Sequence, residues 1–217
     1  MATFREALRQ QRWDDHRFYH HNLVNQSLHF FSANTFLFCY ALMIFDPGMA
    51  SFLAWTLAMA SRQSGHFFFE PKGYDQVNQV THEHKEDIKT GYNLFRKWVL
   101  MSIWASSPLL VWWSPSLFGM CKPAANWVQL LRHIGYVWLF VGVGAVVFRV
   151  VQLFFIRDVQ TGLVWGTKIL TDPFCDFRLY QKSPIRLLRG ERYDGCAEPH
   201  AGPGLISPDE KGLVSNE

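Results

Sequence analysis

The apolar residues of this chain gather into four runs, which are separated by polar or turn-forming segments. The runs extend over residues 28–45, 49–69, 98–113 and 127–156. A transmembrane helix needs about 20 predominantly apolar residues. The second and fourth runs reach this length, the first is close to it, and the third is shorter and contains Pro108. The pattern predicts an all-α integral membrane protein with about four transmembrane helices.

The breaks between the runs indicate how the helices are connected. Asp46, Pro47 and Gly48 separate the first two runs, and these residue types favour a turn. The first two runs are therefore predicted to form a helical hairpin whose free ends return to the same membrane face. The fourth run is longer than a crossing requires, so we expect that helix to tilt or to extend beyond the bilayer.

Lysine and arginine are distributed unevenly among the connecting segments. The N-terminal segment, the central loop at 71–97 and the segment after Arg157 are basic, whereas the two other connections carry only Lys122. Because short cytoplasmic segments of membrane proteins are enriched in Lys and Arg, both termini and the central loop are predicted to be cytoplasmic. The expected location is the bacterial inner membrane or the endoplasmic reticulum, in contact with membrane lipids.

The same pattern divides the chain into three parts. Residues 1–27 suit an amphipathic helix on the membrane surface, or else a solvated helix. Residues 28–157 form the predicted four-span membrane domain with its polar loop. Residues 158–217 form a cytoplasmic tail, in which 168–192 is expected to lie on the lipid surface and the Gly/Pro-rich end is expected to be disordered.

Composition excludes several functions. Of the 217 residues, 49% are hydrophobic and 16% aromatic, and the formal net charge is +3. This charge is small and no basic stripe with interleaved aromatic residues accompanies it, so nucleic acid is not an expected partner. The four cysteines are far apart and form no CxxC pair, which argues against a zinc ribbon or a disulfide framework.

Histidines gather at one predicted membrane face. Of the nine histidines, seven fall in segments assigned to the cytoplasmic side: His16, His20, His21, His29, His66, His82 and His84. Glu70 lies beside them. Imidazole and carboxylate ligands together suit iron or another divalent first-row metal. We therefore expect a metal site at the cytoplasmic face. His133, near the opposite end of the fourth run, is left out of it.

The spacing of these residues limits how they can bind one ion. His66 and Glu70 are four residues apart and so lie on the same face of a helix. His20 and His29 are nine apart, which places them on opposite sides of a straight helix. They converge only if the chain bends between them, and otherwise they would serve two different ions.

Several of the candidate residues have two interpretations. Asn22 and Asn25 lie between His20 and His29, and either cap helix ends at a bend or orient a ligand imidazole. Glu70 is either a ligand or base near the metal, or an interfacial carboxylate paired with Lys72. His82 and His84 project to different faces of a helix but to one face of a strand. They are either additional ligands or residues of a solvated loop.

Two motifs resemble those of a known family. The string FYHHNLVNQSLH resembles the opening motif of the membrane 2-hydroxy fatty acid dioxygenases, which act in the conversion of phytosphingosine to odd-numbered fatty acids. GHFFFE resembles their second motif, a Gly-His at the end of a span with a glutamate four residues after the histidine. The resemblance covers about residues 13–75, and its matching positions are His20, Asn25, His29, Gly65, His66 and Glu70.

The resemblance implies a small multi-span enzyme that uses dioxygen to shorten a 2-hydroxy acyl chain by one carbon. It implies one Fe(II) per chain, held by His20, His29 and His66, with Glu70 and Asn25 as catalytic residues and Glu70 accepting the hydroxyl proton. The substrate would be a hydrophobic acyl compound or lipid. After Glu70 the sequence PKGYDQ replaces the basic residue and Pro-Ala usual in the family. This departure bears on the substrate more than on the metal.

Two other function classes remain open. The HxxxHH spacing from His16 to His21 is used by di-iron membrane hydroxylases and desaturases, which would bind two ions and would recruit His16 and His21 as further ligands. Those enzymes need several such clusters, whereas this chain has one and a later HxH. The second alternative is a non-catalytic membrane scaffold whose histidines bind a metal.

Overall fold

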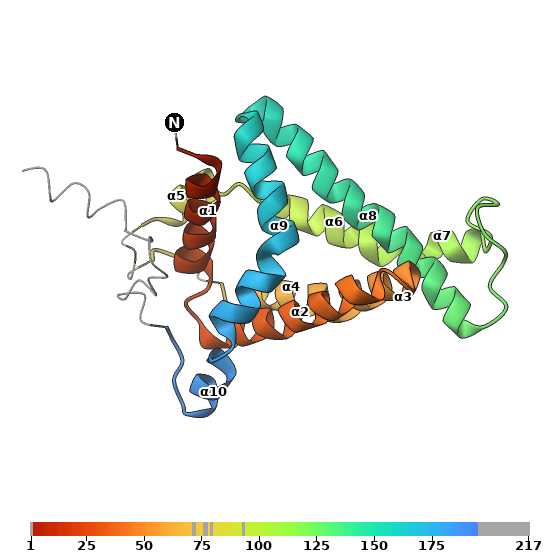
Figure 1. Ribbon diagram of the computed structural model, residues 1–217, viewed down its shortest axis with the longest axis horizontal. Helices are drawn as coiled ribbons and strands as arrows, with labels where there is room; N and C mark the ends of the chain where they lie inside the picture. Colours follow the sequence, from red (N-terminus) through yellow and green to blue (C-terminus); the bar gives the residue numbers. More distant parts are fainter. Residues whose placement is uncertain (1, 71–72, 76–77, 79, 93, 195–217) are drawn as a thin grey trace, which may run out of the picture.

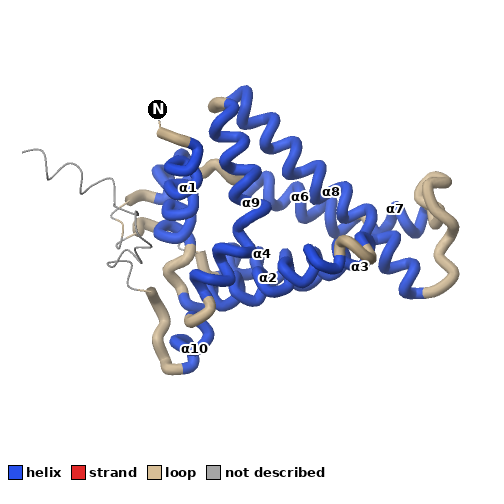
Figure 2. Tube along the Cα trace, in the orientation of Figure 1, coloured by secondary structure: helices blue, strands red, loops and turns tan. Residues whose placement is uncertain are grey.

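The computed structural model describes residues 2–70, 73–75, 78, 80–92 and 94–194. Within these residues the chain is all-helical, without strands and with two isolated β-bridges (Figures 1 and 2). In the described part, one helix, α8 (Trp127–Ile156), is long and apolar enough to cross a membrane. The all-α class is therefore confirmed.

The chain turns sharply between the first two helices. The first, α1 (Phe4–Tyr19), has Thr3 as its N-cap, which exchanges side-chain and backbone hydrogen bonds with Glu6. His20 is its C-cap, and α2 (Leu23–Leu42) begins three residues later. The side chain of Asn22 accepts a hydrogen bond from the Val24 amide and so caps α2. The bend that the nine-residue histidine spacing requires is thus present, and Asn22 is one of its caps.

A second helical stretch runs back along α2. It consists of α3 (Pro47–Leu53), a π-helical segment η1 (Ala54–Met59) and α4 (Ala60–Phe68). Asp46 caps α3 through the Met49 amide, and Pro47 occupies the first turn, where its missing N–H costs no hydrogen bond. All three segments pack against α2 (Figure 1). The predicted helical hairpin is therefore present, with its turn at the expected residues.

The third and fourth runs form α6, α7 and α8. The third run divides into α6 (Leu94–Ser106) and α7 (Pro108–Trp113), because proline favours the first turn of a new helix. The fourth run forms α8 over the predicted residues. Many large apolar side chains on these helices are exposed, among them Trp98, Ile103, Leu109, Trp112, Trp113, Phe140, Val147, Phe148 and Phe155. A short helix, α5 (His82–Ile88), precedes them in the central loop.

The segment after α8 packs into the fold. It forms α9 (Val159–Tyr180) and α10 (Ser183–Leu188), and α9 contacts α1, α2 and α8 (Figure 1). This differs from the expectation that residues 168–192 lie on a lipid surface. Side chains at four-residue intervals share one helix face, and in α9 that charged face is turned inward, with Lys168, Asp172, Asp176 and Tyr180 buried. The expected disordered end lies outside the described residues.

Candidate metal centre

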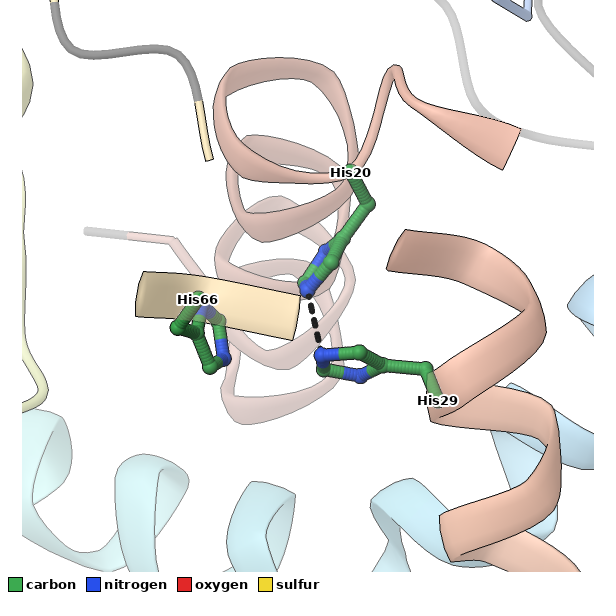
Figure 3. A group of neighbouring side chains, drawn as sticks. All are labelled: His20, His29 and His66. Atoms are coloured by element: carbon green, nitrogen blue, oxygen red, sulfur yellow. Dashed lines mark hydrogen bonds between the residues drawn. The ribbon is translucent and has the colours of Figure 1, made fainter. Parts of the chain in front are cut away.

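Three histidines from three parts of the chain converge at the helix ends. His20 follows α1, His29 lies in the second turn of α2, and His66 lies in the last turn of α4 (Figure 3). One ligand nitrogen from each lies within 4.8 Å of the others, and the Nε2 atoms of His20 and His29 are 3.2 Å apart. The local cause is the α1–α2 turn, which redirects the chain so that residues nine apart can meet. We call His20, His29 and His66 the histidine triad.

Each imidazole of the triad has a carboxylate beside its Nδ1 atom. His66 Nδ1 shares a hydrogen bond with Glu70 Oε2 at 2.9 Å. His29 Nδ1 lies 3.5 Å from Asp176 Oδ2, and His20 Nδ1 lies 4.0 Å from Asp15 Oδ2. Neither of these two buried Nδ1 atoms has a hydrogen-bond partner in the described part of the chain.

The Nε2 atoms of His20 and His29 are within hydrogen-bond distance of each other, and the direction of that bond depends on the tautomers (Figure 3). A neutral imidazole carries one N–H, so a proton on each Nδ1, on the carboxylate side, would leave a lone pair on each Nε2. The two lone pairs would then face each other at 3.2 Å, which is unfavourable without a positive charge between them. Two nitrogen ligands about 2.1 Å from one ion are about 3.0–3.4 Å apart. The donor set and its spacing therefore suit a divalent metal.

Burial keeps His20 available as a ligand. It is the largest cause that lowers the pKa of His20 well below its ordinary value, and it outweighs the opposing charges of Asp15 and Asp176. For Asp15, burial raises the pKa, but the nearby positive charges, chiefly Lys168, outweigh this effect and lower it overall. An uncharged imidazole thus lies beside a charged carboxylate, which is the arrangement that metal ligation by histidine requires.

A buried charge network surrounds the triad. Arg62 Nη1 donates to Asp176 Oδ2 at 2.8 Å, and Arg62 Nη2 lies 3.5 Å from Asp172 Oδ2. Lys168 Nζ donates to Asp172 Oδ2 at 2.7 Å and to Asp15 Oδ2 at 3.0 Å. None of these five residues was predicted to belong to the site. Two signals were present in the sequence: Arg62 is a charge inside an apolar run, and Lys168, Asp172 and Asp176 are spaced by four.

Asn25 holds the turn together from inside α2. It is fully buried, and its Nδ2 donates to the Tyr19 carbonyl at 2.8 Å. It therefore satisfies a carbonyl in the last turn of α1 and fixes the position from which His20 projects. Its Oδ1 has no hydrogen-bond partner among the described residues. The contact corresponds to the helix-end interpretation of Asn25, and its orientation of a ligand imidazole stays a prediction.

Glu70 lies behind His66 rather than among the converging nitrogen atoms. Its Oε2 is bound to His66 Nδ1, and its Oε1 lies 3.3 Å from Lys89 Nζ. Since Nδ1 of His66 is engaged, Nε2 is the nitrogen left for a metal. Among the described residues Lys89 is thus the lysine beside Glu70, whereas Lys72, the predicted partner, lies outside them.

The remaining predicted histidines lie apart from the triad. His16 Nδ1 lies 3.2 Å from the Tyr180 hydroxyl, and His21 Nε2 lies 3.3 Å from Asp75 Oδ2. His82 and His84 lie on α5 with exposed side chains. In the described residues, the group with metal-binding geometry consists of the triad alone.

A cavity of about 340 Å³ lies between α1 and α9, next to the triad. Its walls include Asp15, Asp176 and Tyr180, which also lie against the imidazoles. The Tyr180 ring centroid is 5.8 Å from that of His20 and 6.2 Å from that of His29. Basic side chains line the cavity as well, namely Arg9, Arg12, Lys168 and Arg178.

Comparisons of the chain with protein-family models, with curated proteins and with solved structures found no match. The site is therefore interpreted from its own geometry and from the motif resemblance described above.

Proposed function

We propose that this chain is an iron-dependent membrane oxygenase that cleaves one carbon from a 2-hydroxy fatty acid or a related hydroxy acid. The observation that carries the proposal is the convergence of His20, His29 and His66, with each Nδ1 beside a carboxylate. The same three histidines are the positions that match the dioxygenase motifs. Imidazole suits several first-row metals, so the choice of Fe(II) and of dioxygen as co-substrate rests on that resemblance.

The proposed location is a membrane, with about four spans and both termini in the cytoplasm. Support comes from the length and apolar character of α8 and from the exposed aromatic and aliphatic side chains on α6, α7 and α8. Soluble monomers rarely expose contiguous apolar patches larger than a few hundred Å². A lipid environment would cover these side chains, and it would also supply a hydrophobic substrate.

The cavity between α1 and α9 is the proposed route for the polar end of the substrate. Arg12 lines this cavity, and its buried Nε lies 3.7 Å from Asp172 Oδ1, too far for a hydrogen bond, and has no other hydrogen-bond partner in the described part of the chain. A guanidinium N–H is well suited to a carboxylate oxygen. Arg12 is therefore the proposed contact for the acid group.

Each residue of the site has a proposed role in binding the metal or in orienting a ligand. The triad would hold the metal through its Nε2 atoms, while Glu70 keeps the proton on His66 Nδ1. Bound Fe(II) would supply the activation of dioxygen and of the hydroxy acid. The contacts of Glu70 with His66 and Lys89 favour orientation of the ligand over the proton acceptance that the resemblance implies.

The proposal is tested by loading the purified protein with Fe(II) without oxygen, then adding air and a panel of 2-hydroxy acids. Mass spectrometry should detect an acid shortened by one carbon, together with oxygen uptake. His66→Ala should abolish both, whereas His84→Ala, on the exposed face of α5, should retain them. Absence of a shortened product at every chain length would contradict the proposal. Metal binding without oxygen uptake would favour the scaffold alternative, and two irons per chain the di-iron alternative.

A further inference from the structure

The three carboxylates beside the triad come from three different segments of the chain. Glu70 follows α4, the helix that carries His66, and is held to that histidine by a direct hydrogen bond. Asp15 belongs to α1 and Asp176 to α9. Tertiary packing therefore brings Asp176 to His29, whereas Asp15 precedes His20 by five residues and depends on tertiary packing through its bond to Lys168.

Helix α9 holds both of these carboxylates in place. Asp176 is a residue of α9 itself and is fixed by Arg62 at 2.8 Å. Asp15 is fixed by Lys168 of α9 at 3.0 Å. Because α9 packs against α1 and α2, its charged face reaches the Nδ1 side of His20 and of His29. The Nε2 sides of the same rings point into the triad (Figure 3).

We infer that Asp176 and Asp15 are positioning residues for metal binding, and that α9 is thereby part of the metal site. Each carboxylate would accept the Nδ1–H of its imidazole, so that the Nε2 lone pair is directed at the ion. The two Nδ1 atoms, buried and without a hydrogen-bond partner in the described residues, would gain one through a small approach of these side chains. The inference rests on the metal of the proposed function and is independent of its oxygen chemistry.

Asp172 provides a matched control within the same network. It lies one helical turn before Asp176 on the same face of α9 and pairs with Lys168 and Arg62. Its closest charged partners also include Arg12, at 3.7 Å. No contact joins Asp172 to an imidazole of the triad in the described residues. A loss of metal affinity that is confined to Asp176 and Asp15 would therefore identify positioning of the ligands and not a general charge effect.

The test is an anaerobic titration of detergent-purified variants with Co(II), followed by its absorption bands. Removing a carboxylate that orients a ligand histidine typically weakens metal binding 10–100-fold. Asp176→Asn and Asp15→Asn should each weaken Co(II) binding by about this factor, and Asp172→Asn should bind as the wild type does. With Zn(II) bound, the Nδ1–H resonance of His29 should be protected from exchange in the wild type and exposed in Asp176→Asn.

Asp176→Asn leaves Arg62 with one partner fewer, so a charge-balanced variant is also needed. The double variant Arg62→Gln, Asp176→Asn removes one charge of each sign, and it should retain helical content while binding Co(II) 10–100-fold more weakly. The inference would be overturned if Asp176→Asn and the double variant both bound Co(II) with wild-type affinity. It would also be overturned if Asp172→Asn lost as much Co(II) affinity as Asp176→Asn. Wild-type protein that binds Co(II) but consumes no oxygen would overturn only the proposed reaction. Wild-type protein that binds no divalent metal would overturn both.

Discussion

Gly65 in α4 and Asn25 in α2 fit against each other only because Gly65 has no side chain. A Cβ atom at position 65 would overlap with Oδ1 of Asn25 and would stand 3.5 Å from the His29 ring. Gly65 precedes His66 in sequence, and Asn25 precedes His29 by one helical turn. The close approach of α2 and α4 at this point is therefore what brings His29 and His66 to the same place.

Gly65→Ala tests this close approach. Alanine in place of glycine normally stabilises a helix by about 1 kcal/mol, but overpacking at a tight contact costs about 1–3 kcal/mol. We expect a lower free energy of unfolding and a lower metal content for Gly65→Ala, measured by thermal unfolding in detergent and by metal analysis. Gly144→Ala in α8 is the control, because a Cβ atom at position 144 would enter open space. Equal metal content in the two variants would contradict the steric argument.

Asn25→Ala tests the hydrogen bond that holds the end of α1. Its loss leaves the Tyr19 carbonyl without its Asn25 donor, at a cost of about 1–3 kcal/mol. Because His20 is the next residue, the metal affinity should fall together with the stability. Asn34→Ala, which removes a comparable but exposed bond to the Phe30 carbonyl, should change neither quantity. Thermal unfolding and Co(II) titration of the two variants measure the difference.

Arg62→Met should be among the most damaging substitutions in the chain. It removes the guanidinium that neutralises Asp176 and Asp172, and breaking a buried ion pair from one side costs about 3–5 kcal/mol. Adding Asp172→Asn removes one of the two uncompensated carboxylates and should recover part of the stability. Thermal unfolding of the single and double variants measures this recovery. A double variant less stable than Arg62→Met would show that Asp172 does not depend on Arg62 for neutralisation.

Gly135→Ala tests whether helix packing far from the triad affects thermal stability without affecting metal binding. In α8 this glycine lies against the backbone of Gly48 at the start of α3, and a Cβ there would overlap with the Gly48 carbonyl. We expect reduced thermal stability, while the protein that remains folded binds metal with wild-type stoichiometry. Loss of metal from the folded fraction would mean that this helix contact also sets the geometry of the triad.

The helices could be predicted from sequence because local signals specify them, whereas the choice of His20, His29 and His66 among seven candidate histidines came from the motif resemblance. The Asp46-Pro47 turn, the Asn22 cap and the apolar runs define the hairpin, and a hairpin returns both ends to one place. The nine-residue spacing of His20 and His29 required a bend, and the structure has it between α1 and α2. Whether the helices of the four runs cross a membrane stays a prediction, and α8 alone among the described helices has the length and apolar character for it.

The charged surroundings of the triad could not be predicted, because they depend on long-range packing. Asp15 and Lys168 are far apart in sequence, and only the docking of α9 on α1 joins them. The four-residue spacing of Lys168, Asp172 and Asp176 defines a helix face, but the same pattern is typical of a solvated surface. The contacts of α9 determine that this face points inward. For His82 and His84, the exposed positions on α5 favour the solvated interpretation.

The metal content of the purified chain tests the central claim most directly. Protein prepared and loaded with Fe(II) without oxygen, then freed of loosely bound ions, should contain one iron per chain by elemental analysis. His20→Ala, His29→Ala and His66→Ala should each lose most of it, and His82→Ala should keep it. Two irons per chain, or full iron content in the three triad variants, would contradict the account.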